Sequence, residues 1–417
     1  MKINKDKNIY IIGAGISGLI AAQNLEQKGY VPTILEAAGY IGGRVRTEII
    51  DGWILDVGFQ VLLDAYPMSK KYLNYADLDL QKLSPGARMY TDNDSSIIGD
   101  PLRDISMFFP TLFSSIGSLR DKLKIFQLSL RLKNTSIAAL FNKKEHTTLS
   151  HLQHLGFSDK IITQFFKPFF SGIFLECHLH TSSRMFEFIY KMFAEGFATL
   201  PKAGIGAIAT QLAGQLKTTQ LQLNNEVQKV NTDFITMASG DQYPYDVCIV
   251  ATDPSSFLEG YSVKNRWKTC DTLYFSAPVT DVPRPIIHLS ALSDTLINNI
   301  FYPTSVQRAP DPNLQLISVT VVKQHSFSSE VLVSQVMGEL EKYFSITKTK
   351  FIKHYAIQRS LPDLGTVSYE PNLDLMTYAD KIFLCGDHTA NGSLNAAMVS
   401  GERASYAALN RLRTNLI

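Results

Sequence analysis

The stretch "NIYIIGAGISGLIAAQNLEQKGYVPTILE", residues 8–36, decides the fold of the amino-terminal part of the chain. Its first apolar run ends in glycine, which is typical of a buried parallel strand. Apolar residues then recur near helical spacing until Gly29, and "VPTILE" is typical of a second strand. The stretch therefore predicts a strand–helix–strand unit of an α/β fold.

The turn between the first strand and the helix carries the pattern G-x-G-x-x-G at Gly13, Gly15 and Gly18. The first glycine permits a sharp turn, the second lets a pyrophosphate approach the backbone, and the third lets helix and strand pack closely. The amino end of the helix then offers free N–H groups to phosphates. Glu36 ends the second strand, where its carboxylate can accept hydrogen bonds from an adenosine ribose. We therefore predict a dinucleotide site.

Two further segments favour a flavin over a nicotinamide. "GYIGGRVRT", residues 39–47, places Gly42, Gly43 and Arg44 where a backbone loop can approach a second part of a long ligand. "KIFLCGDHTANGSLNAAMVSG", residues 381–401, is typical of a strand, a turn at Gly386 and Asp387, and a helix lined by small residues. An acidic side chain there can bind a ribityl chain, and the helix start admits a flat ring.

On these motifs the chain resembles the flavin-containing amine oxidase superfamily, which includes protoporphyrinogen oxidases and phytoene and squalene-type desaturases. The resemblance implies non-covalently bound FAD. It also draws on "WILDVGFQVLL" (53–63), "EVQKV" (226–230) and "YDVCIVATDP" (245–254). The cofactor-binding residues that it implies are Gly13, Gly15, Ile16, Ser17, Gly18, Glu36, Ala37, Gly42, Gly43, Arg44, Gly58, Val227, Gly386, Asp387 and Ala397. Ala38 and Tyr40 depart from the family, which often has basic residues there, so Arg44 and Arg46 are expected to carry more of the phosphate contact.

The order of the motifs predicts how the chain is divided. A Rossmann-like FAD-binding domain of the glutathione-reductase/amine-oxidase type should comprise residues 1–85, 201–260 and 356–417. A substrate-binding domain with a mixed sheet and helices should comprise 86–200 and 261–355. The flavin should lie between the domains, where pockets tend to form.

A flavin accepts hydride, so the protein mainly supplies position and electrostatics, and no catalytic residue stands out. Arg359 and His388 are the candidates, the first to orient substrate or flavin and the second because it follows the Gly386–Asp387 turn. The resemblance places Cys270 where amine oxidases have a lysine, with Lys268 two residues away, and Ser393 where they have a cage aromatic. These differences favour a hydride donor that is an apolar isoprenoid, polyene or porphyrinogen. Amine oxidation and a FAD-binding protein without turnover remain alternatives.

Other motifs are weaker. Gly204-x-Gly206-x-x-Ala209 could mark a second dinucleotide site, for NAD(P). The segment before it, "ATLPK", is not expected to form a strand, and no acidic residue ends a following strand, so we do not expect this second site. His151, His154, Cys177, His178 and His180 lack further ligands at a suggestive spacing, so we expect no metal site.

Composition limits the partners. The chain has 417 residues and a net charge of +2, which argues against nucleic acid. The cysteines are too scattered to indicate a disulfide framework, and the sequence shows neither an apolar signal-peptide core nor an apolar run long enough for a membrane span. We therefore predict a cytoplasmic protein. In residues 105–133, Leu119, Leu123, Phe126 and Leu130 form one helical face beside several basic residues. That face is expected either to pack on the substrate domain or to make a peripheral membrane contact that admits a lipid-soluble substrate. The electron acceptor is left open.

Overall fold

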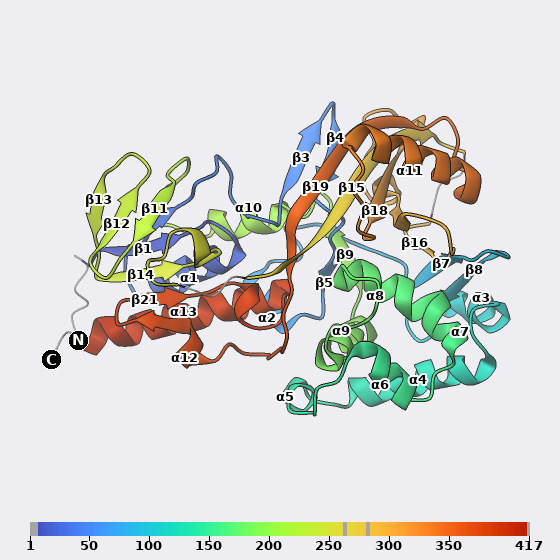
Figure 1. Ribbon diagram of the computed structural model, residues 1–417, viewed down its shortest axis with the longest axis horizontal. Coiled ribbons are helices and arrows are strands. Elements are labelled where there is room, and N and C mark those ends of the chain that lie inside the picture. Colours follow the sequence, from blue (N-terminus) through green and yellow to red (C-terminus); the bar gives the residue numbers. More distant parts are fainter. Residues whose placement is uncertain (1–6, 262–264, 281–283, 415–417) are drawn as a thin grey trace.

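A six-stranded sheet forms the core of the first of two lobes, and three separate stretches of the chain contribute to it (Figure 1). The structure is a computed structural model that describes residues 7–261, 265–280 and 284–414. The strand order is β10 (Gln220–Gln222), β2 (Thr33–Leu35), β1 (Ile9–Ile12), β14 (Val247–Val250), β21 (Ile382–Leu384) and β20 (Thr377–Ala379). All neighbours are parallel except β20 and β21.

Both faces of this sheet are covered, which explains why its strands are continuous apolar runs. Alternate residues of β1 and β14, such as Ile11 and Ile249, pack toward helices α1 (Ile16–Gln27) and α13 (Leu394–Thr414). The residues between them, such as Ile12 and Val250, pack against a small antiparallel sheet. That sheet consists of β11 (Val227–Val230), β12 (Phe234–Met237) and β13 (Gln242–Pro244).

Helices α1 and α13 join the two ends of the chain. At Gly401 an added Cβ atom would lie 2.2 Å from the carbonyl oxygen of Ser17, so only glycine allows the helices to pack this closely. Ser400, the preceding residue, accepts a hydrogen bond from the backbone N–H of Gly386 at 2.9 Å. The carboxyl-terminal helix is therefore fixed to the glycine turn and to the strand end that carries Gly386.

A seven-stranded sheet forms the core of the second lobe. The order is β19 (Lys350–Pro362), β15 (Trp267–Pro278), β18 (Leu314–Val321), β17 (Ile297–Phe301), β16 (Ile287–Ser290), β7 (Gly86–Tyr90) and β8 (Ser95–Gly99). Only the pair β16–β7 is parallel. Helix α11 (Ser329–Phe344) packs on this sheet through Leu332, Val336 and Leu340. The long strands β15 and β19 run from the sheet toward the first lobe (Figure 1).

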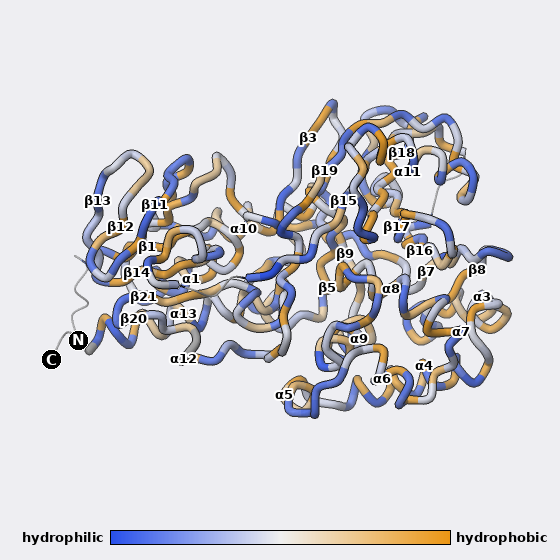
Figure 2. The backbone as a smooth tube through the Cα atoms, viewed as in Figure 1, coloured by the Kyte–Doolittle hydropathy of each residue, from blue (hydrophilic) through white to orange (hydrophobic). Residues whose placement is uncertain are grey.

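Helices cluster below the second sheet in Figure 1, around buried phenylalanines that include Phe166, Phe170 and Phe186. They are α3 (Phe108–Phe113), α4 (Leu119–Lys133), α5 (Ile137–Phe141), α6 (Thr148–His154), α7 (Asp159–Ile161), α8 (Lys167–Phe174) and α9 (Ser183–Glu195). Between the lobes lie α2 (Pro67–Tyr72), α10 (Ala207–Gly214), the hairpin β3 (Thr47–Ile50)–β4 (Trp53–Asp56), and the small sheet β5 (Leu62–Leu63)–β9 (Ala198–Pro201)–β6 (Leu80–Lys82). In Figure 2 the helices of this cluster alternate between hydrophobic and hydrophilic segments.

Two sequence expectations differ from the structure. The predicted boundary at 355–356 falls inside the uninterrupted strand β19. The segment before Gly204 is a strand, β9, and not a loop, because its neighbours β5 and β6 supply backbone partners that its own sequence does not reveal. That strand belongs to a small antiparallel sheet, so no second strand–helix–strand nucleotide unit is formed there.

Candidate active site

A cavity of about 1480 Å³ extends between the two lobes and brings the distant motifs together. Most of the predicted site residues lie on its wall: Gly13, Gly15, Ile16, Ser17, Glu36, Gly42, Gly43, Arg44, Gly58, Gly386, Asp387 and Ala397, and the two catalytic candidates Arg359 and His388. The carboxyl ends of β1, β2 and β21 meet at this edge of the sheet, which is the usual ligand position in open α/β sheets.

The glycine turn is built so that one position faces the cavity and another faces the protein. An added Cβ atom at Gly15 would have no neighbour within 4 Å, whereas at Gly18 it would lie 2.1 Å from the carbonyl oxygen of Gly13. Gly15 is also the residue before the first turn of α1, which therefore begins at the cavity wall. Unpaired N–H groups and the helix dipole at this point favour a phosphate group.

Glu36 is fixed by the backbone on both sides. Its Oε2 accepts a hydrogen bond from Ala14 N at 2.7 Å, and its Oε1 accepts one from Ala38 N at 2.9 Å. Each carboxylate oxygen has further lone pairs, and the side chain lies on the cavity wall. Glu36 can therefore accept hydrogen bonds from ribose hydroxyls without moving.

Arg44 and Asp387, 343 residues apart in sequence, form an ion pair at the cavity wall. Arg44 Nη1 donates to Asp387 Oδ2 at 3.0 Å, and Nη2 donates to Oδ1, so the pair is bidentate. Burial alone would raise the pKa of Asp387, but the Arg44 guanidinium outweighs it and holds that pKa below its ordinary value. The Arg44 guanidinium also lies 5.1 Å from the centre of the Trp267 ring.

The two catalytic candidates have different surroundings. Burial lowers the pKa of His388, against the opposing effect of Asp387, so its imidazole is neutral at neutral pH. Arg359, on β19, is largely exposed, and its Nη1 lies 3.7 Å from Asp253 Oδ2. It therefore stands on the rim of the cavity, near the end of β14, and not deep within the cavity.

Three predicted cofactor residues do not lie on the cavity wall. Gly18 faces Gly13 inside the turn, Ala37 is exposed beside Glu36, and Val227 is buried in the core between the six-stranded sheet and β12. For Gly18 the role that remains is the close packing of helix and strand.

Strand β15 brings to the cavity the two residues that the resemblance singled out, Cys270 and Lys268. Lys268 Nζ donates to Thr181 Oγ1 at 3.0 Å, and burial lowers its pKa, opposed by Glu176 and Asp363. Cys270 Sγ lies 3.2 Å from Ser360 Oγ, and burial raises the pKa of the thiol to about 11. Both the expected cysteine and the neighbouring lysine thus line the same wall.

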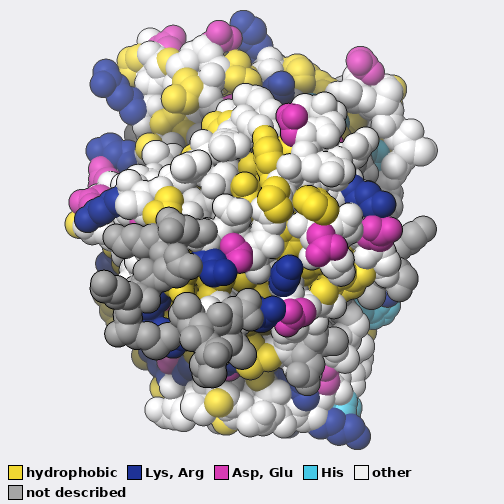
Figure 3. Space-filling model, turned by 90° about the vertical axis from the view of Figure 1, so that its left-hand side faces the viewer, with side chains coloured by type: hydrophobic (Ala, Val, Ile, Leu, Met, Phe, Trp, Pro, Cys, Tyr) yellow, Lys and Arg dark blue, Asp and Glu magenta, His cyan; other side chains and the backbone are white. Residues whose placement is uncertain are grey.

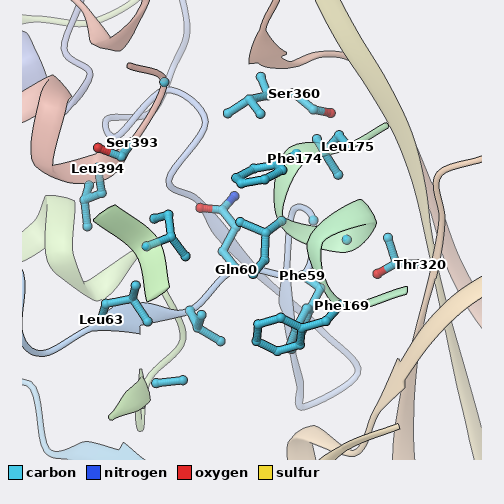
Figure 4. A pocket seen from close by; sticks show the side chains of 18 of the residues that line it. Phe59, Gln60, Leu63, Phe169, Phe174, Leu175, Thr320, Ser360, Ser393 and Leu394 are labelled. Carbon is cyan, nitrogen blue, oxygen red and sulfur yellow. The ribbon is translucent and has the colours of Figure 1, made fainter. Parts of the chain in front are cut away.

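The part of the cavity inside the second lobe is mostly aromatic and aliphatic. Figure 4 shows Phe59, Gln60 and Phe174 at its centre, Phe169 and Thr320 on one side, and Ser393 and Leu394 at the start of α13 on the other. The π-helical turn Ile162–Phe166 adds Phe165, α8 adds Ile173, and α9 adds Met185, Ile189 and Phe193. The segment 165–174 therefore contributes to both the core and the cavity wall.

The cavity reaches the surface at α3 and α4, because Phe108, Leu112, Leu119, Leu123 and Phe126 line it and are also exposed. Helix α4 buries Leu128 and Leu132, while Leu119 and Leu123 are 66% and 57% exposed. The expectation that the face of Leu119, Leu123, Phe126 and Leu130 packs on the lobe is therefore wrong; α4 packs with its other side. We call the exposed residues Phe108, Phe109, Leu112, Phe113, Leu119, Leu123 and Phe126 the apolar mouth.

The opposite end of the molecule differs from this mouth. Figure 3 shows that end, where acidic and basic side chains are interspersed with hydrophobic ones. Within residues 7–261, 265–280 and 284–414, no helix is long and apolar enough to cross a membrane.

The first-lobe part of the cavity fits a dinucleotide. The position above Gly15 is open, the amino end of α1 begins beside it, and Glu36 and Asp387 present carboxylate oxygens at separate points of the wall. These are groups that can bind a pyrophosphate, a ribose and a second hydroxyl-bearing chain, respectively. The contacts fit FAD, the cofactor that the motifs predict.

Comparisons with known proteins agree with this geometry. A family model described as flavin containing amine oxidoreductase matches residues 16–409. The L-amino-acid oxidase of Trimeresurus stejnegeri is 32% identical over 148 residues, which is 33% of this chain and 28% of that protein. The L-amino-acid oxidase of Echis ocellatus is 26% identical over 257 residues, or 57% of this chain and 50% of that protein. The chain thus spans half or less of the length of these relatives.

Solved structures share the fold over nearly the whole chain. A putative protoporphyrinogen oxidase from Exiguobacterium has a TM-score of 0.72 and 15% identity, and the match covers 99% of this chain and 100% of that one. Putrescine oxidase bound to putrescine has a TM-score of 0.68 and 13% identity, with coverage of 97% and 99%. At these identities the likeness is one of fold.

Proposed function

Since the chain belongs to the flavin-containing amine oxidoreductase family and is therefore a FAD-dependent oxidoreductase, we propose that it dehydrogenates an elongated apolar substrate of the isoprenoid, polyene or porphyrinogen type. Bound FAD supplies a hydride acceptor for one hydrogen of the C–H bonds that are oxidised, and the second hydrogen leaves as a proton. The observation that carries the proposal is the aromatic and aliphatic cavity between the glycine turn and the apolar mouth.

The residues of the chain act chiefly by position. Phe59, Phe169 and Phe174 present flat apolar surfaces that exclude water and align an extended hydrocarbon. His388, neutral and buried, adds no positive charge beside such a substrate. Arg44 and Asp387 neutralise each other at the wall, so this pair does not favour an ionic substrate.

Amine oxidation is the second candidate, and Lys268 is the observation that favours it. A lysine lies on the cavity wall next to Cys270, and the matched relatives include L-amino-acid oxidases. Ser393 and Leu394, however, occupy the start of α13, where an aromatic cage for a cation would be expected from the family. The apolar lining therefore favours a hydrocarbon.

The test is anaerobic reduction of the FAD-loaded protein by a panel of candidate donors. A linear polyene or isoprenoid in vesicles should bleach the oxidised-flavin absorption at least about tenfold faster than an L-amino acid or putrescine does. The charged donors must lose their hydration to enter an apolar cavity, and the hydrocarbon incurs no such cost. Phe169→Trp should slow bleaching by the polyene, because the larger ring fills the cavity. Phe234→Trp, on the exposed face of β12, is the matched control. Faster bleaching by an amine would contradict the proposal and favour amine oxidation over dehydrogenation of a hydrocarbon.

We further propose that the apolar mouth makes a peripheral contact with a lipid surface, through which the substrate enters. Phe109 and Phe113 are 66% and 78% exposed, and the Phe109 ring packs against both Phe113 and Phe108, so the exposed rings form one contiguous patch of the kind that marks an interaction site. Helix α4 beside them carries five basic residues and one acidic residue, and that acid, Asp121, is buried in the helix cap with Ser118 and Ser158. An apolar face with a basic border is the pattern that binds anionic membranes.

Replacing Phe108 and Phe109 with serine should therefore lower binding to anionic vesicles at least about fivefold, because two exposed aromatic rings no longer insert among the lipids. Sedimentation with vesicles measures this. Phe234→Ser, at a similarly exposed position far from α3, should sediment like the unaltered protein. Equal sedimentation of the unaltered protein, the double variant and Phe234→Ser would contradict the proposed membrane contact.

A further inference from the structure

Four polar side chains form a cluster where β15, β19 and the start of α11 meet. Asp271 lies on β15, His354 on β19, Ser329 at the first residue of α11, and His325 in the connection before it. The side chains of Asp271, His325 and His354 are 18%, 12% and 11% exposed. Of the four, His354 also borders the large cavity, and none belongs to the groups that bind the dinucleotide.

The hydrogen bonds of His354 determine which of its nitrogens can act as a base. Its Nε2 lies 2.7 Å from Asp271 Oδ1. A carboxylate can only accept, so Nε2 carries a hydrogen, and in the neutral imidazole Nδ1 then keeps its lone pair. Ser329 Oγ lies 2.7 Å from that Nδ1 and therefore donates its hydrogen to it. This is the arrangement of a nucleophile, a general base and an orienting acid.

His325 holds the second oxygen of the same carboxylate. Its Nε2 lies 3.1 Å from Asp271 Oδ2, and its Nδ1 accepts a hydrogen bond from Phe327 N at 3.3 Å. The imidazole is therefore neutral, with Nε2 as its donor. Since both Nε2 atoms donate to Asp271, the cluster orients His354 and does not present free nitrogens to a metal ion.

The surroundings of Ser329 suit an acyl group. The residue is exposed at the amino end of a helix of 16 residues, where the dipole stabilises negative charge. Ser328 caps the helix by accepting a hydrogen bond from Val331 N, so the hydroxyl of Ser329 is not used as the cap. Phe327 and Val331 beside it are 43% and 44% exposed, and the Phe327 ring stacks on His325.

We propose that Ser329 is the nucleophile of a second catalytic site, one that hydrolyses carboxylic esters with a small apolar acyl group. Ser329 Oγ bonds to the ester carbonyl carbon while His354 Nδ1 takes its proton. The carbon–oxygen bond to the alcohol breaks, and the alcohol leaves with that proton. Water, deprotonated by His354, then bonds to the acyl carbon; the bond to Ser329 Oγ breaks, Oγ takes the proton back from His354, and the acid is released. Asp271 and His325 are positioning residues.

The FAD-loaded, full-length protein should react with a fluorophosphonate probe, which phosphorylates serine nucleophiles in the same way with loss of fluoride. Peptide mapping should place the label on Ser329. Labelling should be lost in Ser329→Ala and fall at least about a hundredfold in His354→Gly, the lower end of the range usual for removal of a general base. Added imidazole should restore labelling in His354→Gly, which a purely structural role would not allow. Hydrolysis of p-nitrophenyl acetate should follow the same order.

Ser326→Ala, three residues earlier on the same exposed connection, is the matched control and should label normally. Flavin absorption and thermal unfolding show whether each variant is folded. The proposal is overturned if folded protein is not labelled at Ser329 under conditions that label an ordinary serine hydrolase in the same tube. It is equally overturned if Ser329→Ala hydrolyses the ester as fast as the unaltered protein does.

Discussion

Replacing Gly18 with alanine should destabilise the folded protein and abolish FAD binding, whereas the same substitution at Gly15 should abolish only FAD binding. The new Cβ at residue 18 would lie 2.1 Å from the Gly13 carbonyl oxygen, and backbone cannot yield as a flexible side chain can. Overpacking that forces the backbone to shift typically costs about 1–3 kcal/mol, and occasionally more. At Gly15 the new methyl group meets no protein atom within 4 Å and stands where the pyrophosphate is expected.

The pair of variants separates the two roles of the motif. Denaturant unfolding of the FAD-free proteins should show a clear loss for Gly18→Ala and a change within about 0.5 kcal/mol for Gly15→Ala, as for substitutions that disturb no packing. Binding of added FAD, followed by quenching of its fluorescence, should be weakened at least about a hundredfold in both. Normal FAD binding by Gly15→Ala would contradict the proposed position of the cofactor.

The second large effect is expected at the ion pair between Arg44 and Asp387. Arg44→Met leaves the Asp387 carboxylate buried without its counter-charge. The Arg44 side chain is itself 40% exposed, so the loss of unfolding free energy should lie below the about 3–5 kcal/mol of a fully buried pair. The pKa of Asp387, held low by Arg44, should rise in this variant. A protonated carboxyl needs no counter-charge, so the loss should shrink as the pH is lowered. Unfolding of the FAD-free protein across a range of pH measures both effects.

A double-mutant cycle tests whether the pair acts as a unit. Asp387→Asn combined with Arg44→Met removes both charges and keeps the shape of the pair, so it should cost less than Arg44→Met alone. Asp387→Asn by itself should weaken FAD binding at least about tenfold, because the amide is a poorer acceptor than the carboxylate. Additive losses in the cycle would show that the two side chains are not coupled.

Some of the site residues could be predicted from the sequence and others could not. The residues that line the first-lobe cavity were predictable because their roles depend on backbone geometry within short segments. Gly13 to Gly18 act within one turn, and Glu36 ends the strand that directly follows the helix. Lys268 and Thr181 were not predictable as a pair, because they are 87 residues apart in sequence and lie on different elements of the second lobe.

The same limit applies to helix α4 and to the cluster at Ser329. A period of 3.6 residues shows that Leu119, Leu123 and Phe126 share a face, but it does not show whether that face meets the core or the solvent. The residues of that cluster lie on separate elements, and their spacing in the sequence does not predict that they meet: Asp271, His325, Ser329 and His354.

The sequence by itself determined the α/β fold of the first lobe, its cofactor and the side of the sheet where the cofactor lies, because steric limits on glycine and the dipole of a helix act locally. Only the tertiary structure decided which apolar surfaces line the substrate cavity, that this cavity reaches the surface at the apolar mouth, and which distant polar groups meet. Burial and proximity are properties of the packed chain, and each depends on elements far away in the sequence.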